Sequence, residues 1–434
     1  MSLLSSVGRA PDVSNPSGQV LKAKPTPPLV LAICGTVWVS ASLISLSSGD
    51  QLRYPDEKDY HNLALNLVHA HGFVDEHQQP SAARPPGYPL VLSAVYSLWE
   101  RPLAAKLLNS FACGLTALVL SLMASSIGSR IAGIVAPLLV LCFPLFSYTA
   151  STLYPQTAGT LLFVSAIFFL VRFPSSSKGT IIAGGLFGFL VLMIPAFLLL
   201  LPLFPAYLLI IDRLNAAPMF RRALLFLGCA ALVVAPWTAR NFLQFKSFIP
   251  VSTNTGINLL LGNSPNTKAD SGVNVDISNY VEDSKGMSEV EQDKFFKHAA
   301  ISFVKRDPVA ALLLYCRKVA NYFNFRNQLF ISSESSSLRD TVMLLTYYPL
   351  LLLAVLRLLL CRRFKINPSE AFLFLLYFGN AFLSAIFFTR IRFRIPFDAL
   401  LIILVALFVG LIHSRRESLL AERRQVRVPP GQEK

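Results

Sequence analysis

The sequence predicts an all-α polytopic membrane protein, because apolar segments of membrane-spanning length recur along the chain. Of its 434 residues, 53% are hydrophobic and only 15% are charged, and its mean hydropathy is +0.54. This apolar content is far above what a water-exposed surface tolerates. The composition therefore excludes an ordinary soluble domain.

We expect about ten transmembrane helices, since a helix needs about 20 apolar residues to cross the hydrocarbon core. The candidate spans lie at 28–48, 103–126, 131–149, 156–172, 179–194, 196–211, 223–239, 341–360, 370–388 and 395–413. The apolar stretch from Leu90 to Trp99 is too short to cross, and we expect it to lie in the outer interface.

The positions of Lys and Arg give the orientation, because cytoplasmic loops carry an excess of positive charge. With the N-terminus inside, the cytoplasmic segments hold Lys22, Lys24, Arg130, Arg172, Lys178, Arg213, Arg221, Arg222, Arg362, Arg363, Lys365, Arg415, Arg416, Arg423 and Arg424. The net charge of +15 therefore reports membrane topology, and we expect no nucleic acid as a partner.

The spans and loops divide the chain into successive parts. We expect a cytoplasmic tail (1–27), a seven-span module (28–240) with a long first outer loop (49–102), an extracytoplasmic lobe (241–340), three C-terminal spans (341–413) and a basic cytoplasmic tail (414–434). The lobe should be small and helical, since "SEVEQDKFFKHAAISFVKRDP" has helical spacing that ends at Pro308. Residues 309–330 are apolar but interrupted by basic residues, which favours an interfacial amphipathic helix.

The six cysteines are scattered singly along the chain, and four of them lie inside apolar runs. No CxxC pair occurs, and no histidine lies near a cysteine at metal-ligand spacing. We therefore expect neither a metal nor another cofactor.

The first outer loop opens with "YPDEKDYHNLALNLVHAHG", which predicts an amphipathic helix on the membrane surface, begun by Pro55 and ended by Gly72. Its first turn carries Asp56 and Glu57, and Tyr60 begins an apolar stripe at helical spacing. A carboxylate here could accept a proton from a hydroxyl nucleophile. Alternatively, the two acids only complement the helix dipole.

Arginines at two places on the outer face are candidate phosphate ligands. Arg84 precedes a Pro-Pro-Gly-Tyr turn, and its guanidinium could bind a phosphate through two hydrogen bonds or simply snorkel to the interface. Arg390, Arg392 and Arg394 lie where positive charge should be scarce. On an extended stretch all three would face a lipid-linked phosphate together, whereas on a helix they would splay apart.

Four stretches, in this order along nearly the whole chain, carry a family resemblance. They are "PDEKDYHNLALNL", "ARPPGYPLVL", "APWTARNFLQFKSFIPVSTNTGINLLLGN" and "RFRIPFDALLIIL". With them the chain resembles membrane glycosyltransferases of the GT-C superfamily, in particular bacterial relatives of dolichyl-phosphate-mannose protein mannosyltransferases and of lipid A aminoarabinose transferases. The resemblance implies the GT-C fold, a sugar donor linked to a polyprenyl phosphate, and a multi-pass protein of the bacterial inner membrane whose active site faces outward.

The resemblance also implies roles for individual residues. Asp56 would be the catalytic base and Glu57 a supporting acid. The donor phosphate would be bound by Arg84, Arg390, Arg392 and Arg394. The substrate-binding residues would be Tyr60, Tyr88, Gln156 and, in the "PWTxRN" element, Arg240 and Asn241.

The chain departs from the family pattern at two positions. Relatives commonly have an acid before the fourth span, where this chain has Gln156, and a basic residue before a proline after the fifth span, where it has Ile194. An amide can hydrogen-bond a sugar hydroxyl but cannot take a proton. A shifted donor specificity or weakened catalysis would follow.

The function expected from these residues is inverting transfer of a hexosyl or pentosyl group from a polyprenyl-phosphate donor to an acceptor hydroxyl, with Asp56 as the general base. The acceptor would be a protein, a lipid or a glycan, and membrane lipids would surround the chain. Two other classes stay open: a lipid-linked sugar transporter or flippase, and a catalytically silent lipid-binding relative.

Overall fold

The computed structural model describes residues 27–211, 216–326 and 337–426, and this part of the chain is helical without a β-strand. Most of the predicted N-terminal tail, the turn with Arg213, the end of the expected interfacial segment and the last eight residues lie outside it. The membrane part contains α1 (Pro28–Ser48), α4 (Pro102–Ile127), α5 (Arg130–Leu141), α6 (Leu145–Ala150), α7 (Gln156–Arg172), α8 (Ser177–Met193), η1 (Pro195–Leu200), α9 (Leu203–Ile211), α10 (Ala216–Phe245), α15 (Ser337–Leu359), η3 (Leu360–Arg362), α16 (Pro368–Ala385) and α17 (Ile391–Val426).

Five of the described helices, α1, α4, α10, α15 and α17, are long and apolar enough to cross a membrane, and several shorter apolar helices accompany them. The chain is an integral membrane protein. Each of the ten predicted spans contains helix, but two of them differ in form: 131–149 is divided into α5 and α6, and 196–211 into η1 and α9. Prolines explain both breaks, because Pro144 and Pro202 lack the N–H that would continue the helix.

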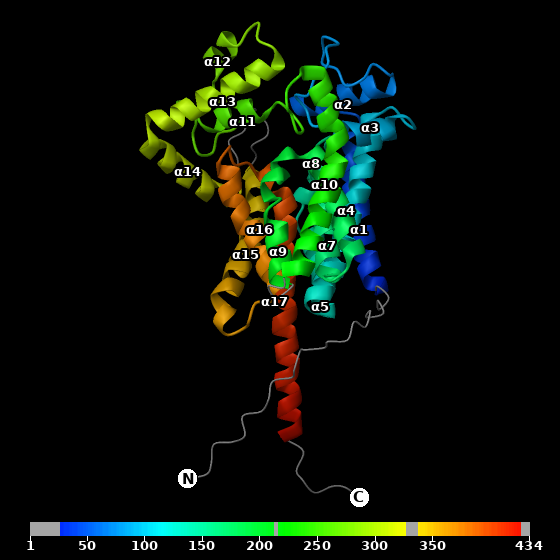
Figure 1. Cartoon of the computed structure of the whole chain (residues 1–434). Coiled ribbons are helices and arrows are strands. Elements are labelled where there is room, and N and C mark those ends of the chain that lie inside the picture. Colours follow the sequence, from blue (N-terminus) through cyan, green and yellow to red (C-terminus); the bar gives the residue numbers. More distant parts are fainter. Residues whose placement is uncertain (1–26, 212–215, 327–336, 427–434) are drawn as a thin grey trace, which may run out of the picture.

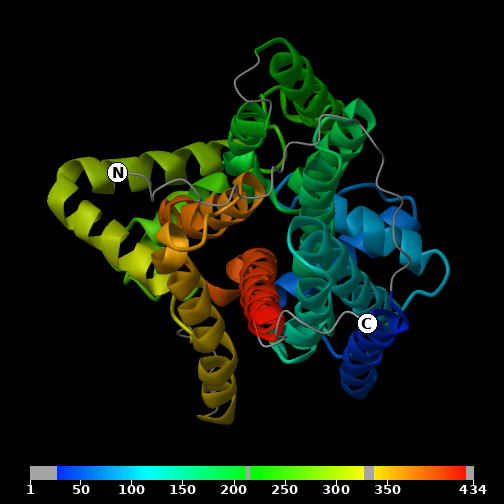
Figure 2. The same cartoon turned by 90° about the horizontal axis from the view of Figure 1, so that it is seen from below.

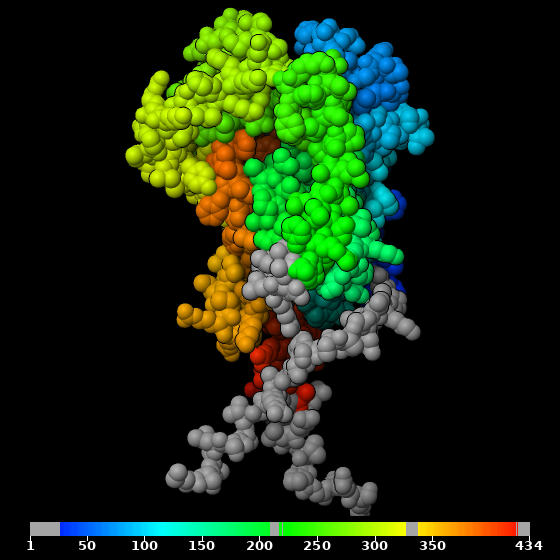
Figure 3. Space-filling view, viewed as in Figure 1, coloured from blue at the N-terminus to red at the C-terminus, as the bar shows by residue number. Residues whose placement is uncertain are grey.

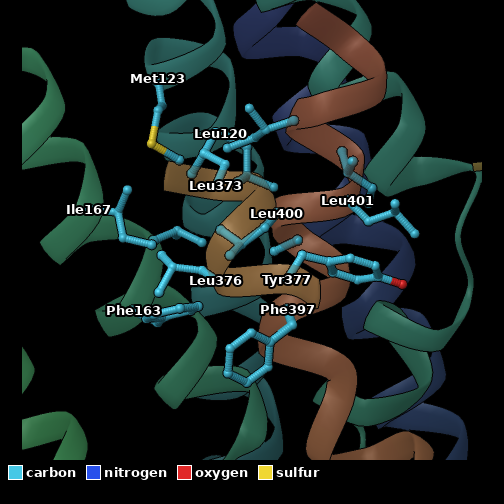
Figure 4. Close-up of a cluster of buried hydrophobic side chains, with 14 of the residues drawn as sticks. Leu120, Met123, Phe163, Ile167, Leu373, Leu376, Tyr377, Phe397, Leu400 and Leu401 are labelled. Atoms are coloured by element: carbon cyan, nitrogen blue, oxygen red, sulfur yellow. The ribbon is translucent and has the colours of Figure 1, made fainter. Parts of the chain in front are cut away.

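Helix α17 forms the centre of the bundle (Figures 1 and 2). In its apolar part 83% of the residues are buried, compared with 22% in α10 and in α15, which lie at the periphery. Its side chains pack with those of α4, α7 and α16 in one continuous apolar core (Figure 4). The helix continues to Val426, so the first part of the predicted C-terminal tail is helical.

The first outer loop and the lobe lie together at one end of the molecule (Figures 1 and 3). The loop contains α2 (Pro55–Val68) and α3 (Gly87–Tyr96), and the lobe contains α11 (Thr255–Gly262), α12 (Ser278–Asp283), α13 (Glu289–Arg306) and α14 (Pro308–Tyr322). The sequence correctly predicted where α2 begins and which stripe it buries, namely Tyr60, Leu63 and Ala64. Helix α3 has 10 residues, too few to cross a membrane, as expected.

Helix α14 is amphipathic, as the sequence predicted for the beginning of 309–330. Val309, Leu312 and Leu313 are exposed, whereas Lys318 is fully buried. The Lys318 Nζ donates hydrogen bonds to the carbonyl oxygens of Gly262 and Phe387, at 3.0 and 2.8 Å. This lysine therefore ties the lobe to the segment that leads into α17.

The close approach of α3 to α8 gives a first prediction. A Cβ added to Gly87 would lie 2.8 Å from the backbone nitrogen of Met193, whereas a Cβ on Gly185 would meet nothing within 4 Å. We expect Gly87→Ala to destabilise the protein by about 1–3 kcal/mol, because overpacking forces backbone shifts. Thermal unfolding of the purified protein should show a lower Tm for Gly87→Ala and no loss for Gly185→Ala; equal Tm values would contradict the close packing.

Candidate active site

Asp56 is held between two arginines that come from distant parts of the chain. Pro55 begins α2, so Asp56 projects from its first turn. The Arg84 Nη2 donates to Asp56 Oδ1 and the Arg392 Nη1 donates to Oδ2, both at 2.7 Å. The Tyr154 hydroxyl lies 3.4 Å from Oδ2. The carboxylate thus receives two charge-assisted hydrogen bonds from opposite ends of the chain.

The charges at this carboxylate determine its protonation. Burial alone would raise the pKa of Asp56, but the positive charges of Arg392 and Arg84, with their hydrogen bonds, outweigh burial and lower the pKa below its ordinary value. The same pairing raises the pKa of Arg84 against the effect of burial. Asp56 is therefore ionised at neutral pH.

Asp59 is a second acid at this site, one turn after Asp56. It accepts hydrogen bonds from Arg84 Nε at 3.2 Å and Nη2 at 2.6 Å. The Arg84 guanidinium also lies over the Tyr60 ring, 5.7 Å from its centre. Arg84 is thus shared by two carboxylates and supported by an aromatic ring. We call Asp56, Asp59, Arg84, Arg392 and Tyr154 the Asp56 site.

Arg392 alone of the three arginines near 390 reaches the Asp56 site. Because α17 begins at Ile391, the stretch is helical and the arginines splay apart, so they do not form one basic face. Arg390 donates to Asn274 Oδ1 in the lobe, at 3.1 Å. Arg394 is 1% exposed and pairs with Asp398 at 3.0 Å. Arg390 and Arg394 were expected to bind the donor phosphate together with Arg392. The structure places neither of them at the Asp56 site.

The Glu57 carboxylate, which the resemblance implied as a supporting acid, is occupied by backbone hydrogen bonds in the structure. Glu57 is fully buried, and both of its carboxylate oxygens accept hydrogen bonds from backbone N–H groups. Oε2 accepts from Tyr54 at 2.9 Å and from Arg53 at 2.5 Å, and Oε1 accepts from Leu153 at 2.8 Å. Glu57 therefore caps α2 and joins it to the turn that carries Tyr154.

The side chains of Arg240 and Asn241, in the "PWTxRN" element, donate hydrogen bonds to backbone carbonyl groups. Arg240 donates to the carbonyl oxygens of Ser81 and Phe73, at 2.8 and 3.0 Å. Asn241 is 0% exposed and donates to the carbonyl of Ile249 at 3.1 Å. These residues fix the first outer loop and the beginning of the lobe onto α10, which is a structural role.

The remaining expected substrate ligands are buried. Tyr88 is 0% exposed, and its hydroxyl accepts a hydrogen bond from Asn109 at 2.9 Å. Gln156 is 5% exposed, and its Oε1 has no hydrogen-bond partner among the described residues. An unsatisfied buried acceptor is rare in a folded protein.

A row of tyrosine rings and arginines continues away from the Asp56 site. The Tyr154 ring lies 5.6 Å from the Tyr54 ring, and the Tyr54 and Tyr148 hydroxyls are 2.7 Å apart. The guanidinium groups of Arg53 and Arg339 lie over the Tyr148 ring, 5.5 and 5.9 Å from its centre. Rings and guanidiniums in this order suit a ligand with apolar and anionic parts.

Comparison with known proteins shows which fold this is. No protein-family model and no curated protein sequence matches the chain. Among solved structures, the oligosaccharyltransferase AglB from Archaeoglobus fulgidus, with an inhibitory peptide and a dolichol-phosphate, is 17% identical with a TM-score of 0.52; the match covers 92% of this chain and 52% of that one. The Archaeoglobus fulgidus oligosaccharyltransferase in its apo form is 13% identical with a TM-score of 0.54; the match covers 92% of this chain and 53% of that one. The chain has the GT-C fold.

A further GT-C structure is similar to the chain at a lower level. ArnT from Cupriavidus metallidurans, bound to undecaprenyl phosphate, is 13% identical with a TM-score of 0.44; the match covers 88% of this chain and 77% of that one. This chain spans about half the length of AglB, so the likeness concerns only part of that protein.

Two members of the Asp56 site, Asp59 and Tyr154, and one residue of the lobe, Glu289, were not among the site residues expected from the sequence. Asp59 follows Asp56 by one helical turn, and Tyr154 precedes Gln156 by two residues in the stretch "TLYPQTAGT", so local spacing contained a signal for both. Glu289, at the start of α13, contacts the loop before Arg84. Nothing in its local sequence distinguishes it from an ordinary acid in the first turn of a helix.

The contrast between the two acids of α2 gives a second prediction. Glu57→Gln should destabilise the protein by about 1–3 kcal/mol, because an amide nitrogen cannot accept from the backbone N–H groups that the carboxylate now satisfies. Asp56→Asn keeps an amide oxygen that can accept from one arginine, and Arg84 stays paired with Asp59 at 2.6 Å, so the Tm should change less. Thermal unfolding of both variants checks this order, and the reverse order would mean that the two roles are exchanged.

Proposed function

We propose that the chain is a glycosyltransferase that moves a sugar from a polyprenyl-phosphate donor to an acceptor hydroxyl on the outer face of the membrane, with inversion and with Asp56 as the general base. One observation carries the proposal: an ionised carboxylate lies between two arginines, and the buried Nε of Arg392 has no hydrogen-bond partner among the described residues. AglB, which shares the fold, was solved with a dolichol-phosphate, a lipid of the proposed class.

The phosphate of the donor would bind to Arg84 and Arg392, with the sugar between the phosphate and Asp56. In the reaction the bond from the anomeric carbon to the phosphate oxygen breaks, and its electron pair leaves with the phosphate. The acceptor oxygen attacks the opposite face of the sugar, and Asp56 takes its proton. Negative charge grows on the leaving phosphate, where the two guanidinium groups stabilise it. We propose that no metal ion is required.

Binding of the donor also frees the base. In the structure both arginines hydrogen-bond to Asp56, so the carboxylate has little capacity to accept a proton. A phosphate would compete for the same guanidiniums, while Asp59 keeps Arg84 close to the site. The base would therefore become available only when the leaving group is in place.

Gln156 is the candidate ligand for the transferred sugar. Its Oε1 is a buried acceptor without a partner in the described part of the chain. It follows Tyr154 by two residues, and the Tyr154 hydroxyl lies beside Asp56. We propose that it accepts a hydrogen bond from a sugar hydroxyl. The acceptor substrate would be a protein, a lipid or a glycan.

Transfer of radiolabelled sugar from polyprenyl phosphate in membranes tests the function. Asp56→Asn removes the base, so its turnover should be about 10²–10⁴-fold lower than that of the wild type, which is the usual contribution of a positioned base. Lys58→Gln, a change at the neighbouring exposed residue, is the matched control and should keep wild-type turnover. Near wild-type turnover of Asp56→Asn would remove Asp56 from the base role. Donor binding without turnover by the wild-type protein, across a panel of sugars, would indicate a silent relative.

The pH dependence of transfer follows from the position of the arginines. The pKa of Asp56 is lowered in the free protein, so the acidic limb of kcat/KM should lie below the ordinary pKa of an aspartate. In the complex the phosphate draws the arginines away, while burial continues to raise the pKa of Asp56. The acidic limb of kcat should therefore lie at a higher pH than that of kcat/KM. Coincident limbs in steady-state profiles would show that the arginines stay on Asp56.

A further inference from the structure

Glu289 connects the lobe to the loop that carries Arg84. Its Oε2 accepts a hydrogen bond from the Ser81 hydroxyl at 2.8 Å, and its Oε1 accepts from the backbone N–H of Ala82 at 3.0 Å. Oε1 also accepts from the hydroxyl of Thr253, at the entrance to the lobe. One carboxylate therefore holds two segments that are far apart in the sequence.

The helix that carries Glu289 does not need this residue for its own N-terminus. The Ser288 hydroxyl accepts from the backbone N–H of Glu291, and the Glu291 carboxylate accepts from the backbone N–H of Ser288 at 2.9 Å. This capping box satisfies the first turn of α13. The Glu289 carboxylate is directed away from its helix, which an acid serving only the helix dipole would not require.

The loop around Ala82 has its polar groups satisfied from several sides. Arg240 donates to the Ser81 carbonyl at 2.8 Å, and the Thr253 N–H donates to the Ala82 carbonyl at 3.0 Å. On the other side of Arg84, the tight contact of Gly87 with Met193 fixes the start of α3. Arg84 therefore lies on a short stretch of backbone that is held in place at both ends, at Ala82 and at Gly87.

We propose that Glu289 is a positioning residue for Arg84, so that the lobe completes the donor-phosphate site. The proposal rests on the function proposed above, in which Arg84 binds the phosphate. Without the Glu289 contacts, the backbone before Arg84 would lose two of its hydrogen bonds to the lobe and keep the one from the Thr253 N–H. A guanidinium displaced by about 1 Å loses much of its preorganised hydrogen-bond geometry toward the phosphate, so the donor binds more weakly.

The first experiment measures binding of undecaprenyl phosphate to the purified full-length protein and donor KM and kcat in transfer. We expect Glu289→Gln to weaken binding and to raise the donor KM by roughly tenfold, because the amide nitrogen cannot accept from Ala82 or Ser81. Because the variant leaves Asp56 in place, kcat should fall less than KM rises. Glu289→Asp keeps a carboxylate and should recover part of the binding.

Asp293→Asn is the matched control, because Asp293 is a carboxylate one turn further along α13. It accepts a hydrogen bond from the Gly256 N–H at 2.6 Å and pairs with Lys297 at 2.5 Å, and both partners lie within the lobe. This variant should lower the Tm while keeping lipid-phosphate affinity. If Glu289→Gln does not fold, the pair of variants Ser81→Ala and Thr253→Val removes two of the same contacts, and the double variant should show the same increase in KM.

The outcomes separate this inference from the proposed function. If Arg84→Gln weakens lipid-phosphate binding while Glu289→Gln and the double variant bind like the wild type, Glu289 has no positioning role. If Asp293→Asn weakens binding as much as Glu289→Gln, the effect is lobe stability alone and the inference is overturned. Wild-type binding by Arg84→Gln would instead refute the phosphate role of Arg84 itself.

Discussion

The contact that the outer face depends on is the pairing of Asp56 with Arg84 and Arg392. Arg84 lies 28 positions and Arg392 336 positions from Asp56. An aspartate with ion pairs on both oxygens fixes where the first outer loop meets the start of α17. The two helices of the first loop can bury one face against the bundle because these charges are satisfied. The same pairing gives the site its chemistry, since it holds an ionised acid beside two anion-binding groups.

Helix α17 explains why Arg392 is placed so firmly. Two residues later, Arg394 is buried at 1% exposure and pairs with Asp398, and its guanidinium lies 3.7 Å from the centre of the Tyr347 ring. A buried ion pair is costly to break, because removing one partner leaves an unpaired charge in an apolar core. Rotation of α17 would break the hydrogen bonds from Arg394 to the carbonyl oxygens of Tyr322 and Asn324 and its contact with the Tyr347 ring. The register that buries Arg394 therefore also directs Arg392 toward the outer loop.

Local patterns predicted the helices, but only distant contacts show how the arginines are used. The spacing after Pro55 gave the start and the buried stripe of α2 correctly, because both depend on neighbouring residues. The sequence left open whether Arg390, Arg392 and Arg394 share a face, since this depends on whether α17 begins before or after them. The contacts of Glu289 and of Arg240 join segments that no periodicity relates. These contacts therefore needed the three-dimensional structure.

The two positions that depart from the pattern of the resembled family, Gln156 and Ile194, lie close together, so we interpret them as a pair. Gly159 follows Gln156 by three residues on the same face of α7, and a Cβ on it would lie 2.7 Å from Ile194 Cδ1. An acid at 156 and a base at 194 would therefore be near neighbours. Losing only one of two paired charges would leave the other buried without a partner, whereas replacing both leaves no unpaired charge, only the Gln156 amide oxygen without a partner among the described residues. The joint replacement removes a pair at no such cost, while Asp56 keeps both of its arginines.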